Sequence, residues 1–355
     1  MKKTIITVTG IRPDFIRMSK IFKKLDQHFN HILIHTGQHF DKNLSDVFFE
    51  ELEIRNPDYN LSIGGLNKEH FHQTAELSVK LIELIRKENL NPDLILFLGD
   101  SNSVTASVSL KKEGYRIGHV EAGMRSYDKR MLEEINRTVC DHCSDFLFVY
   151  HENYRMKALK ENIKDDSIFV VGNTIVEVVK DFIPQETKKQ SHILLDIHRP
   201  ENFKYKNRLQ NIIEYSNYIS EHYGLPVYML GFSRTLNQLS EFGIDTGNIQ
   251  IIDLQPFKSY LDLVYHSKIL ISDSGTGQEE PAMLNTPVVV PRDFTERPES
   301  VESNCSYMLN VNSSNNHTWI ESLKWSENNF KNKNLGWLGD GLTSEKIIKI
   351  IKEKI

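Results

Sequence analysis

The first half of the chain alternates short runs of β-branched and aliphatic residues with longer amphipathic stretches. The short runs have the length of buried strands, and the longer stretches repeat their apolar residues at helical spacing. Alternation of this kind predicts βαβ units that build a parallel sheet. The expected strands are Ile5–Thr9, Ile32–His35, Leu94–Leu98, Ile117–Val120, Phe146–Val149 and Ile168–Val171. The expected helices include Ile16–Leu25, Thr74–Glu88 and Met131–His142.

The pattern lapses at residues 181–190, where Pro184, Gln185 and paired lysines predict a hinge. A second α/β series follows. Its expected strands are Ile193–Ile197, Val227–Leu230, Ile249–Ile252, Ile269–Ile271 and Val288–Val290, and its helices include Asn207–Tyr223 and Gln278–Leu284. The sequence therefore predicts two Rossmann-like domains facing across a cleft, residues 1–180 and residues 181–342. A closing helix, residues 343–355, could pack back on the first domain.

Length and composition agree with two α/β domains. A chain of 355 residues is too long for one ordinary core. The net charge of −5 argues against binding to nucleic acid or to an anionic membrane, which needs a basic face. No apolar run approaches the roughly 18 to 20 residues that span a bilayer. Because three cysteines cannot all pair, reduced thiols and a cytoplasmic location are expected.

Polar signatures follow the strands of the first predicted domain. Gly10 and Arg12 stand between the first strand and a helix, where backbone N–H groups and a guanidinium could meet a phosphate. The Gly-x-Gly-x-x-Gly and Walker A patterns are missing at this turn, which disfavours NAD and ATP chemistry. Asp100 and Glu121 end two successive strands, so two acids should lie side by side at one sheet edge.

Each of these acids also has an ordinary structural interpretation. Asp100 could be the N-cap of a helix. A glutamate at the end of an apolar strand, such as Glu121, gains little from burial, which favours a catalytic or ribose-binding role. Glu133 and Glu134 open a predicted helix, where the dipole favours acids even without a function.

The second predicted domain carries its own signatures at strand ends. His198 follows one strand and could donate a proton or contact a phosphate. Ser274 and Gly275 lie in a small-residue turn before a helix, a geometry that presents N–H donors to an anion. One of the two glutamates in the first turns of this helix, Glu279 or Glu280, could reach ribose hydroxyls, and Arg297 supplies a cation further along.

Taken together, these motifs resemble the non-hydrolysing UDP-N-acetylglucosamine 2-epimerases over nearly the whole chain. The family order of motifs is present at Gly10-Ile11-Arg12-Pro13-Asp14, Thr36-Gly37-Gln38-His39, Gly99-Asp100, His119-Val120-Glu121-Ala122-Gly123, Glu133-Glu134-Ile135-Asn136-Arg137, Gly172-Asn173-Thr174, Asp273-Ser274-Gly275 with Gln278-Glu279-Glu280, and Thr295-Glu296-Arg297-Pro298-Glu299. The resemblance implies a GT-B-like fold and an isomerase that inverts C2 of a UDP-N-acetylhexosamine. Such an enzyme eliminates UDP to a 2-acetamidoglucal, adds it back and supplies sugars for surface polysaccharides.

The resemblance also implies roles for particular residues. The carboxylates and histidine that match the family's catalytic groups are Asp100, Glu121, Glu133 and His198. The residues that match its UDP-sugar contacts are Arg12, Arg17, Gln255, Tyr260, Ser274, Gly275, Glu280 and Arg297. Arg17 replaces a common lysine, and Tyr260 replaces a phenylalanine that stacks beside uracil. The resemblance implies a homodimer that requires neither a metal nor a redox cofactor.

Alternatives remain open at this point. A truncated segment from Arg125 to Glu133 and the run His198-Arg199-Pro200-Glu201 look like branches that act on a UDP-2-acetamido-2,6-dideoxy-L-hexose. A GT-B glycosyltransferase would share the fold, but it has no reason for three acids in the first domain. A hydrolysing epimerase and a non-catalytic nucleotide-sugar sensor are further hypotheses, which the Arg12-Pro13-Asp14 start and the retained acids disfavour.

Overall fold

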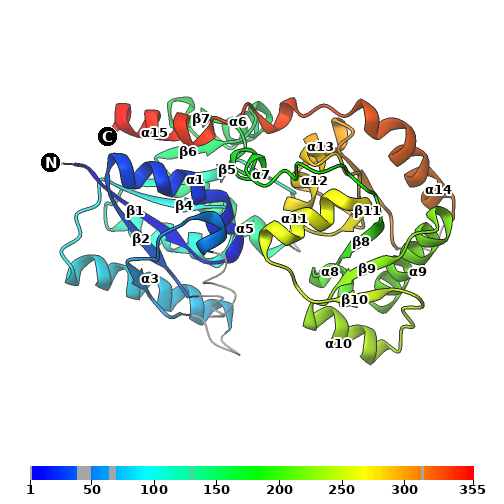
Figure 1. Ribbon diagram of the computed structural model, residues 1–355. Helices are drawn as coiled ribbons and strands as arrows, with labels where there is room; N and C mark the ends of the chain where they lie inside the picture. The colour runs from blue at the N-terminus through cyan, green and yellow to red at the C-terminus, as the bar shows by residue number, and fades with distance from the viewer. Residues whose placement is uncertain (1, 38–48, 64–68, 129–130, 313–315) are drawn as a thin grey trace. The chain divides into compact units, whose positions relative to one another are not determined.

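The computed structural model describes residues 2–37, 49–63, 69–128, 131–312 and 316–355 (Figure 1). The chain divides into two compact units. One is Met1–Val178 with Leu338–Ile355, and the other is Val179–Trp337. None of the helices in the described ranges has the length and apolarity that a membrane crossing requires.

The first unit is built on a parallel sheet whose described strands run in the order β3-β2-β1-β4-β5-β6-β7. The strands are β1 (Thr4–Thr9), β2 (Asn30–His35), β3 (Tyr59–Asn60), β4 (Leu94–Leu98), β5 (Ile117–Ala122), β6 (Phe146–Val149) and β7 (Ile168–Val170). The helices are α1 (Arg12–His28), α3 (His70–Lys87), α4 (Ala106–Lys112), α5 (Leu132–Cys143), α6 (Glu152–Lys160), α7 (Ile175–Lys180) and α15 (Thr343–Lys354). The closing helix α15 belongs to this unit and packs against α1.

The second unit has a parallel sheet in the order β10-β9-β8-β11-β12-β13. Its strands are β8 (His192–Asp196), β9 (Val227–Leu230), β10 (Gln250–Ile252), β11 (Ser267–Ser272), β12 (Val288–Val290) and β13 (Ser306–Met308). Its helices are α8 (Pro200–Phe203), α9 (Lys206–Tyr223), α10 (Ser233–Phe242), α11 (Phe257–His266), α12 (Glu280–Met283), α13 (Pro298–Glu302) and α14 (Asn316–Lys324). The two parallel sheets confirm the predicted α/β class.

Each sheet reverses its strand order once. In the first unit β1 neighbours β4, and in the second β8 neighbours β11. The chain leaves the two neighbouring strands toward opposite sides of the sheet. Open α/β sheets bind their ligands at the carboxyl ends of such strands. The residues that follow these strands are Gly10 and Gly99 in the first unit and Ile197 and Asp273 in the second.

The expected helices differ from the structure at their ends by one to four residues, and one of them is interrupted. The first begins at Arg12 instead of Ile16, because Pro13 fits the first helical turn and the Asp14 side chain satisfies backbone donors there. The expected helix Gln278–Leu284 is interrupted at Glu279, between a 3₁₀ turn and α12. The short strands β3 and β13 were not among the expected elements.

Gly123 fixes the loop that follows β5. Its φ is +77°, and a Cβ atom added there would lie 2.7 Å from the carbonyl oxygen of Tyr154. We expect Gly123→Ala to lower the melting temperature of the protein, because a left-handed alanine costs about 1–2 kcal/mol and the clash adds about 1–3 kcal/mol. Thermal unfolding followed by circular dichroism measures the change.

Gly114 offers a matched control, since its φ is +88° but an added Cβ atom would meet nothing within 4 Å. Gly114→Ala should therefore lower the melting temperature only by the conformational cost. Equal melting temperatures for the two variants would show that the Tyr154 carbonyl does not constrain the loop.

Candidate functional site

The turn after β1 is held by Asp14. Its Oδ2 accepts hydrogen bonds from the backbone N–H groups of Gly10, at 2.7 Å, and Ile11, at 3.2 Å. Burial outweighs these two donors and raises the pKa of Asp14 to about 7. Arg12, predicted to contact phosphate, is the first residue of α1, where the helix N-terminus favours an anion.

Glu121 lies in a bulge of β5. The register with β6 shifts between Val120 and Ala122, and Glu121 has a φ of +70°. A bulge re-aims a side chain, and a left-handed glutamate costs about 1–2 kcal/mol. Its Oε2 lies 2.7 Å from Arg17 Nη1, with both side chains almost excluded from solvent, and accepts a hydrogen bond from the Tyr150 hydroxyl at 3.1 Å. The bulge thus places the Glu121 carboxylate against two donors, Arg17 and Tyr150.

Asp100 follows β4 and forms an ion pair with Arg137 of α5. The side-chain amide of Asn136, on the same helix, donates to the backbone carbonyl of Asp100 at 2.9 Å. Glu133 is half-buried in the first turn of α5, whereas Glu134 accepts two backbone N–H groups of the preceding loop. Glu134 therefore has a structural role that accounts for its conformation.

A buried histidine ties the loops of the two acids together. His119 Nε2 lies 2.7 Å from the carbonyl oxygen of Gly99, and Nδ1 lies 2.6 Å from Asp141 Oδ1. Asp141 Oδ2 accepts the backbone N–H of Gly123 at 3.0 Å and pairs with Arg125 at 2.7 Å. Since a carbonyl and a carboxylate both only accept, both ring nitrogens donate, and the imidazole is charged.

The charge on His119 agrees with its surroundings. Burial opposes the cation, but Cys140 and Asp141 more than offset this and raise the pKa of His119 well above its ordinary value. The buried network connects the residue before Asp100 with the residues on both sides of Glu121, so the two strand ends are held in a fixed relation.

In the second unit His198 follows β8 beside two aspartates. Its Nδ1 lies 3.0 Å from Asp196 Oδ1 and 3.5 Å from Asp273 Oδ1. Asp273 also accepts the backbone N–H groups of His198, at 3.0 Å, and Arg199, at 3.1 Å. Burial lowers the pKa of His198, but the two carboxylates outweigh it, and the net effect is a raised pKa. A protonated imidazole suits contact with a phosphate.

The small-residue turn after β11 packs against an arginine. A Cβ atom at Gly275 would lie 2.7 Å from Arg297 Nη1, so only glycine allows this approach. Arg297 is buried and pairs with Glu279 and Glu296, each at 2.6 Å. Its guanidinium charge is therefore partly compensated within the protein.

The remaining predicted contacts lie around the same sheet. The Tyr260 hydroxyl donates to Asp196 Oδ2 at 3.4 Å, and burial raises the pKa of this hydroxyl well above its ordinary value. Ser274 donates its backbone N–H to Ser272 Oγ at 3.1 Å. Gln255 lies in the loop before α11, and Glu280 is buried at the start of α12.

Several residues that complete the site were not among the predicted ones. They are Arg137, Asp141, Tyr150, Asp196 and Asp273. Asp273 and Asp196 could have been found, since each lies at a strand end beside a predicted residue, but the contacts of Arg137, Asp141 and Tyr150 join elements that only the fold brings together. Gln38 and His39 of the quoted motifs lie outside the described residues.

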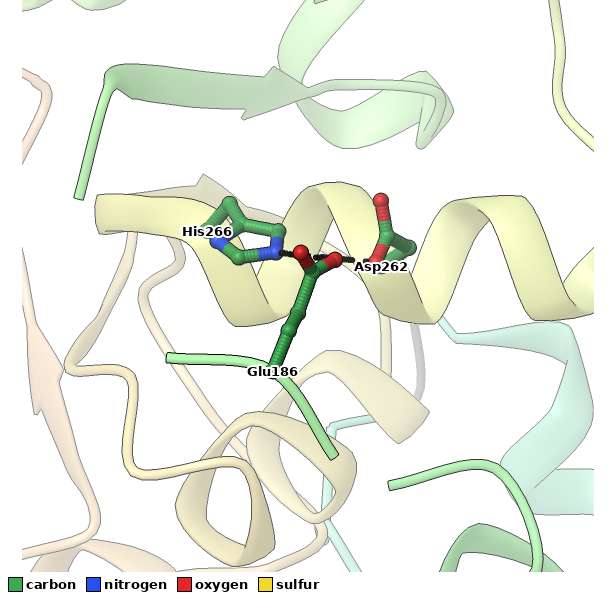
Figure 2. A group of neighbouring side chains, drawn as sticks. All are labelled: Glu186, Asp262 and His266. Carbon is green, nitrogen blue, oxygen red and sulfur yellow. Dashed lines mark hydrogen bonds and ion pairs between the residues drawn. The ribbon is translucent and has the colours of Figure 1, made fainter. Parts of the chain in front are cut away.

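One surface group of the second unit has the composition of a metal site. Figure 2 shows Glu186, Asp262 and His266, whose ligand atoms lie within 4.8 Å of one another. His266 Nδ1 accepts the backbone N–H of Lys189 at 3.2 Å, so Nε2 carries the proton and donates to Glu186 at 3.2 Å. Hydrogen bonding accounts for this arrangement.

The sequence and the structure were compared with those of known proteins, and both comparisons point to one family. Residues 23–352 match the model described as UDP-N-acetylglucosamine 2-epimerase. A Methanococcus maripaludis protein of that name is 35% identical, over 97% of this chain and 97% of its own. A Pseudomonas aeruginosa UDP-2,3-diacetamido-2,3-dideoxy-D-glucuronate 2-epimerase is 33% identical, over 86% and 88%. The crystal structure of Methanocaldococcus jannaschii UDP-GlcNAc 2-epimerase with UDP-GlcNAc and UDP aligns with a TM-score of 0.89 and 32% identity, covering 99% of each chain.

We expect Asp141→Asn to lower the melting temperature strongly at pH 6.5, because breaking a buried ion pair costs about 3–5 kcal/mol. Folding raises the pKa of His119, so the stability from this pair is complete below about pH 6.5 and is lost as pH rises through the folded value. The decrease in melting temperature caused by Asp141→Asn should therefore be smaller at alkaline pH. It should not vanish, because Arg125 also pairs with Asp141 and stays charged. Thermal unfolding of both proteins from pH 6 to 10 measures it.

Asp165→Asn is a suitable control, because Asp165 pairs with Arg155 at an exposed position. Exposed pairs contribute about 0–1 kcal/mol. If Asp141→Asn lowered the melting temperature no more than Asp165→Asn at pH 6.5, the inference that His119 is charged would be refuted.

Proposed function

Because the chain belongs to the UDP-N-acetylglucosamine 2-epimerase family of isomerases, we propose that it interconverts UDP-GlcNAc and UDP-ManNAc by inverting C2 of the sugar. The observation that carries this proposal is the pair of carboxylates, Asp100 and Glu121, at neighbouring strand ends, each paired with an arginine. Inversion requires one proton carrier for each face of the carbon. We propose a cytoplasmic enzyme whose product supplies surface glycans.

The chemistry of the substrate explains why UDP must leave. C2 of an acetamido sugar has no adjacent carbonyl, so its proton is not removed alone at neutral pH. In the proposed step a carboxylate takes the C2 proton, a double bond forms between C1 and C2, and the C1–O bond breaks with its electron pair going to UDP. Protonation of C2 on the opposite face and addition of UDP at C1 then give the epimer.

The proposed carriers are Asp100, Glu121 and Glu133, with His198 assisting in the second unit. Arg17 pairs with Glu121, and Arg137 pairs with Asp100. These ion pairs support a proton acceptor at both strand ends in the enzyme without substrate.

The negative charge that develops on departing UDP requires donors. We propose Arg12 at the N-terminus of α1 for this role. The other UDP-sugar contacts that we propose are Arg17 in the first unit and, in the second unit, Gln255, Tyr260, Ser274, Gly275, Glu280 and Arg297. Removing one well-placed donor of such a set typically lowers turnover by about 10²–10³-fold.

The identity of the sugar is a separate question. A relative of this chain at 33% identity carries the name of a diacetamido-glucuronate epimerase, so substrates differ among proteins this similar. The alternative substrate we retain is a UDP-2-acetamido-2,6-dideoxy-L-hexose. NMR of the chain with UDP-GlcNAc and with 6-deoxy-L-sugars identifies the substrate by the appearance of the C2 epimer.

We expect the protein in D2O to convert UDP-GlcNAc to UDP-ManNAc with deuterium at C2, and we expect Glu121→Gln and Asp100→Asn to lower this turnover by at least ~100-fold, the usual scale for a general acid or base. Both variants keep the size of the side chain and remove its ability to carry a proton. Proton NMR follows the C2 signal and the products together.

Glu353→Gln is the matched control, since this glutamate is exposed near the end of α15. It should behave as wild type. Transfer of the sugar to an acceptor without exchange at C2 would point to a glycosyltransferase, and normal exchange in either acid variant would remove that acid from the mechanism.

We also propose that the chain forms a homodimer through its first unit. Helices α3, α4 and α5 pack side by side and leave apolar side chains exposed. These side chains are Phe71, Val79, Val108, Leu132 and Ile135, each at least 39% exposed. A group of apolar residues on neighbouring helices is typical of a surface that another protein covers.

We expect wild type to elute with twice the chain mass and Val79→Glu to shift the population toward monomer, because a charge in a buried interface is costly. Size-exclusion chromatography with light scattering measures the mass. Met156→Glu, on the exposed side of α6, should leave the mass unchanged. A monomeric wild type would refute the dimer.

A further inference from the structure

Two donors meet at one oxygen of Glu121. Oε2 receives Arg17 Nη1 at 2.7 Å and the hydroxyl of Tyr150 at 3.1 Å. The other oxygen, Oε1, lies on the side of Gly99, 3.9 Å from the position where a Cβ atom would stand. Both donors thus act on the same oxygen, Oε2, while Oε1 lies toward Gly99, the residue between β4 and Asp100.

Tyr150 is placed for this contact by the sheet. It follows the last residue of β6, the strand that pairs with β5 beside the bulge, and it is only 3% exposed. Its hydroxyl also lies 2.7 Å from Thr174 Oγ1. Because the tyrosine has one proton and the carboxylate can only accept it, Thr174 donates to Tyr150 and Tyr150 donates to Glu121.

The same loop orients both donors. Thr174 holds the hydroxyl of Tyr150, and Asn173 Oδ1 accepts from Arg17 Nη1 at 3.5 Å. Asn173 is itself fixed, since its N–H donates to the carbonyl of Leu338 at 2.8 Å and its side chain accepts the N–H of Ile175 at 3.0 Å. The proposed function gives no role to the motif Gly172-Asn173-Thr174. Its side chains orient the two donors that contact Glu121.

We propose that Tyr150, held by Thr174, is a positioning residue that fixes the orientation of Glu121 and favours its charged form during proton exchange at C2. The inference rests on the proposed function, because it assigns Glu121 to that exchange. In this role both residues act through the carboxylate of Glu121, which Tyr150 contacts directly and Thr174 contacts through Tyr150.

The charges around Glu121 define what the hydroxyl contributes. Arg17 of α1 and Tyr150 after β6 stabilise the carboxylate anion. Asp14 of α1 and Asp100 after β4 are acidic neighbours that oppose it, and Asp100 is in turn paired with Arg137 of α5. Removing the hydroxyl leaves the cation and the acids in place, so the balance moves toward the protonated carboxyl.

Tyr150→Phe is the direct test, since it deletes only the hydroxyl. On the UDP-sugar that wild type epimerises, we expect kcat to fall about tenfold or more with KM within about twofold. The acid limb of kcat/KM against pH should move up by about one pH unit. Thr174→Val, which keeps the shape and removes the orienting donor, should shift the same limb in the same direction by a smaller amount.

Tyr215→Phe is the matched control. Tyr215 is fully buried in the second unit, and its hydroxyl lies 2.8 Å from Ser322 Oγ, so the variant loses a comparable hydrogen bond far along the chain from Glu121. It should lower the melting temperature without moving the pH profile. If Tyr150 had only a structural role, Tyr150→Phe would likewise lower the melting temperature and leave the pH profile unchanged.

The outcomes separate the inference from the function. If wild type exchanges the C2 proton and both Tyr150→Phe and Thr174→Val keep its pH profile and kcat, the positioning role is overturned and the proposed function stands. If Tyr150→Phe fails to fold, the pH profile of Thr174→Val decides. If wild type exchanges no proton on any UDP-amino sugar, the proposed function fails and the positioning role fails with it.

Discussion

The site of the first unit depends on a buried ion pair between Arg17 and Glu121. Their side chains are 3% and 8% exposed, so both charges have lost most of their hydration. Such a pair is stable only when good geometry and further hydrogen bonds replace the lost water. The surrounding structure provides them through the bulge in β5, the hydroxyl of Tyr150 and the amide of Asn173. Much of the local sequence thus serves one carboxylate.

Only part of the fold could be predicted from the sequence. β4, β6, β9 and β12 were predicted with their observed bounds, because continuous apolar runs between polar residues are the signature of strands buried on both faces. β3 and β13 are as short as or shorter than β12, but they lack its continuous apolar run, so nothing in their sequence marks them as strands. The start of α1 was missed because it depends on the Asp14 side chain capping backbone donors, which is not a matter of apolar spacing.

The same distinction applies to the candidate site. Asp100 and Glu121 could be predicted to be neighbours, because the carboxyl ends of parallel strands share one edge. The contact of Tyr150 with Glu121 requires the one-residue shift in register between β5 and β6, and nothing in the alternation of residues reveals such a shift. Asp141 lies within a helix pattern that accounts for it as an ordinary polar position. Sequence therefore indicated the chemical groups, whereas the groups that orient them appear only in three dimensions.

The two acids are not equivalent, although each has an arginine. The side chain of Glu121 is 8% exposed and that of Asp100 is 26% exposed. Coulomb interactions weaken as the effective dielectric rises, so water screens the neighbours of Asp100 more than those of Glu121. A charge change nearby, such as the arrival of a diphosphate, should therefore act more strongly on Glu121 than on Asp100. An enzyme that must offer a base on one face and an acid on the other gains from this asymmetry, because substrate binding itself can then distinguish two carboxyl groups that the sequence presents as a pair.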